Sequence, residues 1–137
     1  MRPEMIVLIG DFMSQKIAEK LPFDQFRVYF DTIAQTVKDN DYKCLRDQTH
    51  WIFVPSIEDP GQTKLIPCLP LSDYFLSGAR GTSVNKILKN VTLASNPLRI
   101  SYYGKEIVIT RYNYFKKLKK NHLAKIQVQQ EKVLNGK

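Results

Sequence analysis

The sequence predicts an α/β fold in which a strand–helix–strand unit is followed by a β-hairpin and a helix. Residues 5–9 (MIVLI) and 51–54 (WIFV) are short apolar runs, typical of strands buried on both faces. Between them, residues 26–37 place large apolar side chains four, three and four positions apart, which is one face of an amphipathic helix. A strand, a helix and a strand over roughly 50 residues form a βαβ unit, whose crossover is right-handed.

The helix has recognisable ends and a clear apolar face. Pro22-Phe23-Asp24 is typical of a helix start, with Asp24 as the N-cap or a first-turn acid. We expect the helix to end near residues 39–41. Its apolar face indicates core packing rather than a ligand site, and it consists of Phe26, Phe30, Ile33 and Val37.

Proline makes the following segment irregular. Residues 55–72 contain four of the seven prolines, so we expect an extended loop there. Residues 77–90 predict a loop with at most one short helix.

The second half of the chain predicts a second sheet region. Residues 91–94 (VTLA) form a short β-rich run. Residues 99–110 contain two such runs around the Gly-Lys pair at 104–105, which predicts a hairpin with a type II′ turn and Gly first. Residues 112–120 follow with helical spacing, whereas residues 121–137 are polar and predict a frayed tail or an unpacked helix.

Length and charge limit the classes of function. A chain of 137 residues is enough for one modest domain. Its formal net charge is +8, and residues 81–137 hold twelve Lys or Arg and two acids, against nine and eleven in residues 1–80. This asymmetry predicts an anionic partner, with nucleic acid first; the alternative is a solvated basic face or tail.

Cysteine usage and hydropathy place the chain in a soluble intracellular class. Cys44 and Cys68 lack metal-binding spacing and predict free thiols in a reducing compartment, with a single disulfide as the weaker alternative. No apolar run reaches the length of about 18 residues that predicts a membrane span. The first residues lack the pattern of a signal peptide.

The stretch WIFVPSIEDPG at residues 51–61 has the pattern of an active-site loop. A strand runs into a Pro-rich loop that carries Glu58 and Asp59, and metal-dependent phosphoesterases place ligands on such loops. The structural alternative is that an acid here accepts backbone N–H groups and caps a turn. Asp11, which follows the first strand, can cap a helical turn in the same way.

Five segments occur in a familiar order: GDF after the first strand, then FVPSIEDPG, LIPCLPL, NPLRI and KEIVITR. From about Pro3 to Asn121 the chain resembles the B-subunit family of the eukaryotic replicative DNA polymerases, and in particular its polymerase epsilon branch. The resemblance implies a partial calcineurin-like phosphoesterase fold over residues 1–121, followed by a basic polar tail over residues 122–137. It also implies a fragment, because the OB fold and further sandwich strands of that family have no counterpart here.

The resemblance implies a non-catalytic scaffold that takes part in DNA replication in the nucleus. Its partners would be the C-terminal domain of the catalytic subunit of DNA polymerase epsilon and other polymerase subunits, with direct DNA contact left open. Two alternatives are an active metal-dependent phosphoesterase and a stand-alone basic nucleic-acid-binding module.

The phosphoesterase motifs of the resembled fold are altered in this chain. Active enzymes carry Gly-Asp-x-x-Asp, whereas residues 10–14 read GDFMS, so that Ser14 replaces the second acid. They also carry Gly-Asn-His followed by an acid, where residues 56–59 read SIED. Ile57 cannot bind a metal ion, and Glu58 takes the place of the histidine.

Neither histidine of the chain fits as a metal ligand. His50 precedes the second strand, at its opposite end from the loop, and His122 lies in the basic tail. We therefore expect no metal, no cofactor and no catalysis.

The basic second half has its own candidate contacts. The lysines that would meet DNA phosphates or an acidic partner are Lys116, Lys117, Lys119 and Lys120. Nearby aromatic side chains can stack on bases, although packing within the hairpin and helix is the favoured interpretation. They are Tyr102, Tyr103, Tyr112 and Tyr114.

Overall fold

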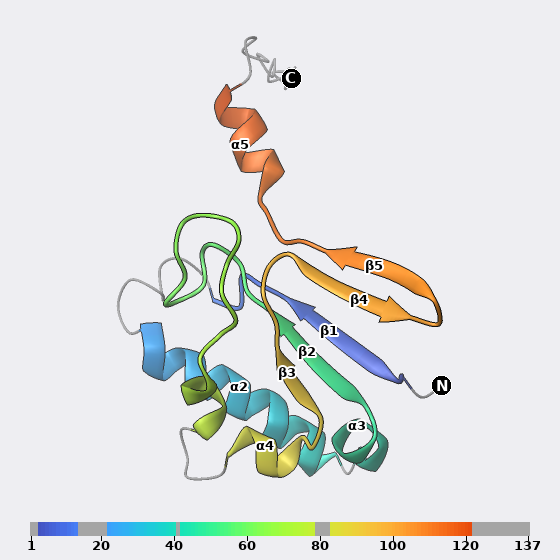
Figure 1. Cartoon of the computed structure of the whole chain (residues 1–137). Helices are drawn as coiled ribbons and strands as arrows, with labels where there is room; N and C mark the ends of the chain where they lie inside the picture. The colour runs from blue at the N-terminus through green and yellow to red at the C-terminus, as the bar shows by residue number, and fades with distance from the viewer. Residues whose placement is uncertain (1–2, 14–21, 41, 79–82, 122–137) are drawn as a thin grey trace, which may run out of the picture.

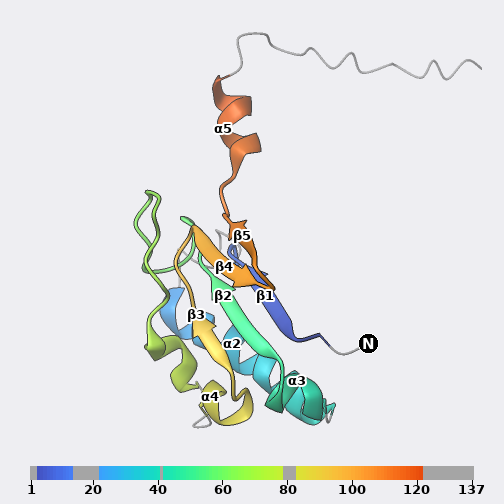
Figure 2. The same ribbon diagram turned by 45° about the vertical axis from the view of Figure 1, so that its right-hand side comes forward.

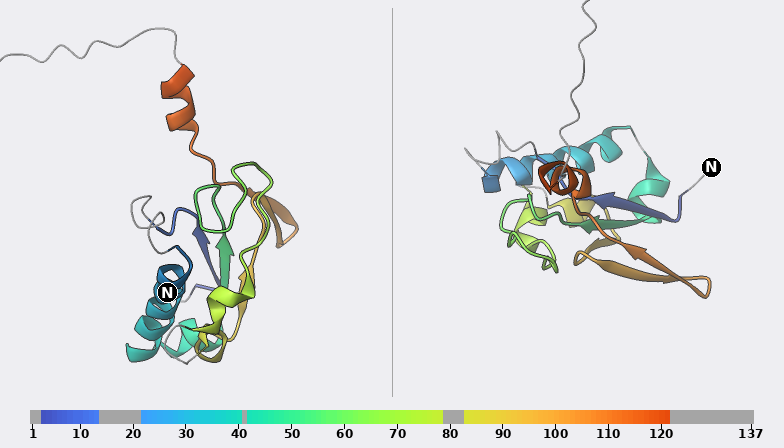
Figure 3. Two further views of the ribbon diagram at one scale, coloured as in Figure 1. Left: turned by 90° about the vertical axis from the view of Figure 1, so that its left-hand side faces the viewer. Right: turned by 90° about the horizontal axis from the view of Figure 1, so that it is seen from above.

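The computed structural model describes residues 3–13, 22–40, 42–78 and 83–121, and these form an α/β fold of three layers. A parallel sheet lies in the middle, helices cover one face, and a β-hairpin covers part of the other (Figure 1). Figure 3 shows this order from the side, with the sheet between the long helix and the hairpin. The tail predicted for residues 122–137, with His122, lies outside the described residues, as does Ser14.

The central sheet has three parallel strands in the order β1-β2-β3: β1 (Met5–Ile9), β2 (His50–Val54) and β3 (Val91–Leu93). The two predicted strands are confirmed. The assignment of residues 91–94 to a second sheet region is wrong, because β3 pairs with β2. A three-residue strand carries no pattern that tells which neighbour it will join.

The prediction that β1 is buried on both faces is confirmed only in part: Ile6 and Leu8 pack against the helix-side core and Met5 and Val7 against the hairpin-side core. Its side chains are half-buried, and Ile9 is exposed. β1 forms one edge of the sheet within the described residues, since β2 alone pairs with it there. An apolar run indicates that both faces of a strand are apolar, but it does not indicate how completely an edge strand is buried.

The helical layer packs on one face of the sheet. α2 (Pro22–Asp39) begins and ends where the sequence predicts, with Asp24 in its first turn. Phe26, Phe30 and Val37 are buried against the β2 side chains that point toward the helix, Trp51 and Phe53. The ring centroids of Phe30 and Phe53 lie 4.8 Å apart.

Three short helices complete this layer. α3 (Lys43–Asp47) was not predicted, nor was the 3₁₀ helix η1 (Asp73–Ser77), which packs against α2. α4 (Val84–Ile87) is the short helix expected between residues 77 and 90. Both cysteines are free thiols, as predicted, with Cys44 exposed and Cys68 buried.

The hairpin layer is built from β4 (Leu98–Tyr102) and β5 (Lys105–Ile109), which pair antiparallel. Leu98, Ile100 and Ile109 pack on the other face of the sheet, against Ile52, Val54 and Ala94. Side chains alternate along β2, so Trp51 and Phe53 face the helices while Ile52 and Val54 face the hairpin.

The hairpin turn differs from the predicted one. Tyr102 pairs with Lys105, so the two turn residues are Tyr103 and Gly104 rather than Gly104 and Lys105. Their φ values are 47° and 73°, and positive φ at both positions is the pattern of a type I′ turn. The predicted type II′ turn is therefore wrong by one residue in register.

The last described element, α5 (Tyr114–Asn121), extends away from the body of the fold (Figure 2). It starts two residues later than predicted. Tyr114, Phe115 and Leu118 are all well exposed on it. α5 therefore contributes little to the core of the described residues.

Candidate functional site at the carboxyl ends of the strands

The candidate site lies where β1 and β2 end, at the carboxyl edge of the sheet. Ligands of parallel α/β sheets bind at this edge. Gly10 follows β1, and its N–H donates to the carbonyl of Val54 at 2.7 Å. A Cβ on Gly10 would lie 2.5 Å from the Cβ of Ser56, so only glycine allows the two loops to approach this closely.

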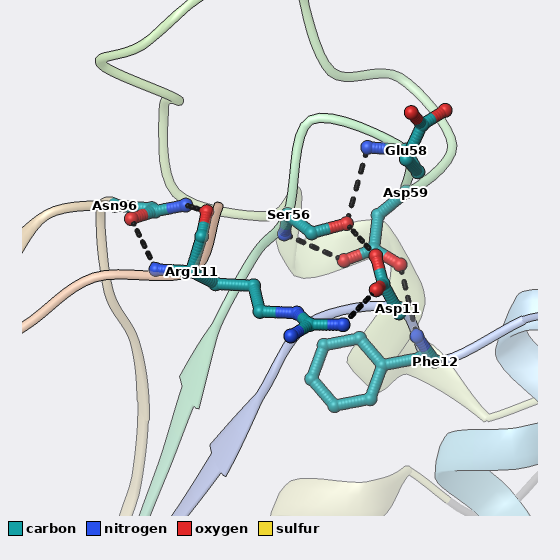
Figure 4. Close-up of polar contacts among 7 residues, drawn as sticks. All are labelled: Asp11, Phe12, Ser56, Glu58, Asp59, Asn96 and Arg111. Atoms are coloured by element: carbon teal, nitrogen blue, oxygen red, sulfur yellow. Dashed lines mark hydrogen bonds and ion pairs between the residues drawn. The ribbon is translucent and has the colours of Figure 1, made fainter. Parts of the chain in front are cut away.

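Asp11 joins three segments of the chain at this edge (Figure 4). Its Oδ1 accepts a hydrogen bond from Ser56 Oγ at 2.6 Å, and its Oδ2 forms an ion pair with the guanidinium of Arg111. Ser56 Oγ in turn accepts the N–H of Glu58 at 3.1 Å. Its carboxylate thus binds side chains of two distant segments, while residues 14–21, where the helical turn that Asp11 was expected to cap would lie, are outside the described residues.

Asp59 has the structural role that its position in the loop predicts. It is buried, and its carboxylate accepts the N–H of Phe12 at 3.0 Å and the N–H of Ser56 at 2.7 Å. Burial raises the pKa of this carboxyl above 3.8, against the lowering effect of the two backbone hydrogen bonds, and the nearby Asp11 raises it further. Asp59 therefore fixes the loop after β2 to the loop after β1.

Glu58, the other acid of the loop, points away from this network. Its carboxylate forms an ion pair with Lys64 at 3.2 Å. The two adjacent acids that suggest an active site in the sequence thus have different surroundings.

Asn96 and Arg111 were not predicted as site residues. Asn96 is fully buried, its Oδ1 accepts the N–H of Arg111 at 3.0 Å, and its Nδ2 donates to the carbonyl of Arg111 at 2.8 Å. Its backbone also exchanges two hydrogen bonds with Cys68, at 2.9 and 3.1 Å. Asn96 therefore holds Arg111 in place opposite Asp11.

Metal-ligand clusters are absent from the part of the chain that the structure describes: no three His, Cys, Asp or Glu side chains there could hold a metal ion together. His50 lies at the amino end of β2, as predicted, and its Nε2 lies 2.7 Å from Thr92 Oγ1. The carboxylates of Asp11 and Asp59 come together at the carboxyl edge, but both already accept hydrogen bonds.

The predicted basic contacts lie on α5, away from this network (Figure 1). Lys117 and Lys119 are exposed, and Lys117 Nζ lies 5.4 Å from the ring centroid of Tyr112. Lys116 and Lys120 belong to the same helix.

The packing expected of the four tyrosines is found in part for Tyr112, which is partly buried, and for Tyr102, which is 39% exposed, but not for the other two. Tyr103 is 83% exposed and Tyr114 is 60% exposed. Their rings contact each other in pairs instead, Tyr102 with Tyr103 at 4.6 Å and Tyr112 with Tyr114 at 4.9 Å between centroids. The first pair lies at the turn of the hairpin, and the second lies at the start of α5.

No helix within the described ranges is both long and apolar enough to cross a membrane.

Comparison with known proteins places the chain in one family. The family model for the B subunit of DNA polymerases alpha and epsilon matches residues 1–135. The DNA polymerase epsilon B subunit of Eremothecium gossypii is 30% identical over 94% of this chain and 20% of its own length. The proteins of the same name from Candida glabrata and Schizosaccharomyces pombe are each 28% identical over 88% of this chain, and over 18% and 20% of their own lengths. The chain thus spans about a fifth of the length of these relatives, and it belongs to the B-subunit family of DNA polymerases alpha and epsilon.

Proposed function

We propose that this chain acts as a non-catalytic scaffold within an accessory subunit of DNA polymerase epsilon, in DNA replication in the nucleus. Its relatives carry the name of the B subunit of that polymerase. The partner proposed for it is the C-terminal domain of the catalytic subunit. The parallel sheet between helices and a hairpin supports a partial phosphoesterase-like domain over residues 1–121.

The observation that carries the non-catalytic part is the ion pair of Asp11 with Arg111. A two-metal phosphoesterase needs carboxylates that are open to its metal ions. Here one oxygen of Asp11 accepts the hydroxyl of Ser56, and the other is next to the Arg111 guanidinium. A guanidinium at this place supplies the positive charge that neutralises Asp11, and it cannot activate a water molecule as a metal does.

A direct assay tests this part. Purified chain is incubated with Mn²⁺ and a phosphodiester substrate, and we expect no turnover above that of the buffer with Mn²⁺. Metal-dependent turnover that is lost in Asp11→Ala would contradict the proposal and support the phosphoesterase alternative.

The exposed apolar face of α5 supports the scaffold part. Phe115 is 77% exposed and Leu118 is 69% exposed, three residues apart on one helix face. An eight-residue helix is marginal alone, and exposed apolar side chains at such spacing are typical of a helix that docks on a partner.

Co-purification with the C-terminal domain of the catalytic subunit tests that surface. We expect Phe115→Asp and Leu118→Asp each to weaken binding at least about tenfold, as for a residue at the centre of an interface. The matched control is Val108→Asp, which places the same charge on an exposed apolar position of the hairpin. Equal binding by all variants would show that α5 is not part of the interface with the catalytic subunit.

DNA binding by α5 is a second candidate function, because Lys117 and Lys119 are exposed and Lys117 Nζ lies beside the ring of Tyr112. The proposed phosphate contacts are Lys116, Lys117, Lys119 and Lys120, and Tyr112 and Tyr114 are the rings proposed to stack on bases. A gel-shift series over salt concentration tests it: binding should weaken steeply with salt, and the absence of binding at low salt would end this idea.

A further inference from the structure

A basic cavity lies at the end of the sheet opposite the Asp11 network. It has a volume of about 300 Å³, and its lining residues come from the last turn of α2, the helices α3 and α4, and the residues just after α4. Its lining consists of Lys38, Arg46, Asp47, Lys86, Ile87 and Lys89. Four cationic side chains thus surround a single carboxylate.

The single carboxylate is already neutralised. Asp47 Oδ2 lies 3.1 Å from Arg46 Nη2, and Asp47 Oδ1 lies 3.2 Å from Lys89 Nζ. Within the ranges that the structure describes, Lys38 and Lys86 have no ion-pair partner, and both are exposed. The described lining of the cavity therefore carries more positive charge than its one carboxylate can neutralise.

Hydrogen bonds to backbone carbonyls hold the walls of the cavity together. The N–H of Lys89 donates to the carbonyl of Arg46 at 3.1 Å, and Asn90 Nδ2 donates to the carbonyl of Asp47 at 3.3 Å. Ile87 is buried beneath it. The basic groups are thus placed by elements packed on one another rather than by a free tail.

Helix ends explain only part of this clustering. Lys38, Arg46 and Lys86 lie in the last turns of α2, α3 and α4, where cations favour the carbonyl ends. α3 has five residues and α4 has four, too few for a strong dipole. Lys89 lies outside all three helices.

We propose that this cavity binds a backbone phosphate of duplex DNA. Lysine binds phosphate as a point charge, and such contacts position a protein on DNA without reading its sequence. None of the described lining residues is aromatic, which disfavours single-stranded DNA, whose binding depends on base stacking. A lysine-rich site whose one apolar side chain is buried also differs from protein–protein interfaces, which are depleted in lysine.

This site is independent of the proposed contact between α5 and the catalytic subunit, so either can fail alone. The test uses the full 137-residue chain and a fluorescein-labelled duplex of mixed sequence, with anisotropy measured over a KCl series. Lys38→Glu and Lys86→Glu change the cavity, whereas Lys105→Glu makes the same change in net charge at the exposed end of the hairpin. Circular dichroism melts check that all variants remain folded.

We expect each cavity variant to weaken duplex binding and to reduce the slope of log affinity against log salt by about 1. Lys105→Glu should leave that slope unchanged. Three outcomes would overturn the proposal: no duplex binding by the wild type at low salt, an equal effect of Lys105→Glu, or complete loss of binding in Lys117→Glu/Lys119→Glu.

Competitors separate the possible sources of negative charge. Unlabelled duplex should displace the probe at lower concentration than the matching single strand or polyglutamate does. Displacement by polyglutamate at equal charge concentration would indicate an acidic protein partner and would overturn the assignment to DNA. NMR shifts of Lys86 report whether inorganic phosphate or the duplex binds in the cavity. Shifts with inorganic phosphate but none with the duplex would also overturn the assignment to DNA.

Discussion

Arg111 and Asp11 lie one hundred residues apart in the chain, yet their side chains form an ion pair at the carboxyl edge of the sheet. The pair connects the loop after β1 to the segment between the hairpin and α5 (Figure 4). It thereby fixes the direction in which the chain leaves the sheet toward α5.

Arg111→Ala should lower the free energy of unfolding by at most about 1 kcal/mol, because both side chains are partly exposed and the pair is screened. Urea unfolding measures this. The control is Arg99→Ala, which breaks the more exposed pair with Glu106 and should have a smaller effect. A double-mutant cycle with Asp11→Asn should give a coupling energy above zero; a coupling of zero would mean that the pair adds nothing to stability.

Gly10→Ala should destabilise the fold by more than Gly104→Ala does. Both glycines have positive φ, 31° and 73°, which costs about 1 kcal/mol or more for alanine. At Gly10 the new methyl group would also overlap Ser56, whereas at Gly104 it would meet open space. Equal losses in urea unfolding would show that the loops can separate without cost.

Asp59→Asn should lower the free energy of unfolding by about 1–3 kcal/mol at neutral pH, because an amide can accept only one of the two N–H groups well. The pH dependence has a defined sign. Burial raises the pKa of Asp59 in the folded state, so folding favours its protonated form, and this contribution is complete below the unfolded value of 3.8. It is lost as the pH rises through the folded pKa. Carbon-13 NMR titration of the carboxyl group checks this, and a pKa below 3.8 would contradict it.

Tyr102 should ionise only at high pH. The hydrogen bond that its hydroxyl donates to the carboxylate of Glu4 raises its pKa from 10.0 to about 12. The contribution of this hydrogen bond to the free energy of unfolding is therefore present below pH 10, and it is lost as the pH rises through about 12. Absorbance at high pH measures the titration. Glu4→Gln should move this step to lower pH, and an unchanged curve would exclude the contact in solution.

Phe26→Ala should unfold much of the chain. The ring is fully buried and packs against Phe30 and Phe75, with centroids 5.1 and 4.8 Å away, and removing it costs about 3–5 kcal/mol. The same substitution at Phe115 should change stability by less than about 0.5 kcal/mol, because that ring is exposed. A large loss for Phe115→Ala in thermal melts would show that α5 packs on the fold.

Much of the fold could be predicted because its signals are local. The apolar runs of β1 and β2 and the spacing along α2 depend on residues that are neighbours in the chain, and all three elements were found. The partner of β3 and the register of the hairpin turn were wrong, since each depends on which distant strand or residue pairs with it.

The residues of the candidate site also differ in whether the sequence could predict them. The sequence offered backbone capping as a role for an acid of the SIEDPG loop, and the structure assigns it to Asp59, which accepts two backbone N–H groups, rather than to Glu58. Asn96 and Arg111 were missed, because they reach the carboxyl edge only after the hairpin folds back over the sheet.

Residue order alone was enough to establish the types and approximate bounds of β1, β2 and α2 and the resemblance to the family that the comparison then showed. The contacts at the carboxyl edge became visible only in three dimensions: the guanidinium of Arg111 on Asp11, held by a buried Asn96. The meeting of positive charges from α2, α3 and α4 around one cavity also emerged from the packed structure. The reason is physical: the spacing along a chain encodes periodic local structure, whereas the meeting of charged side chains depends on how layers pack.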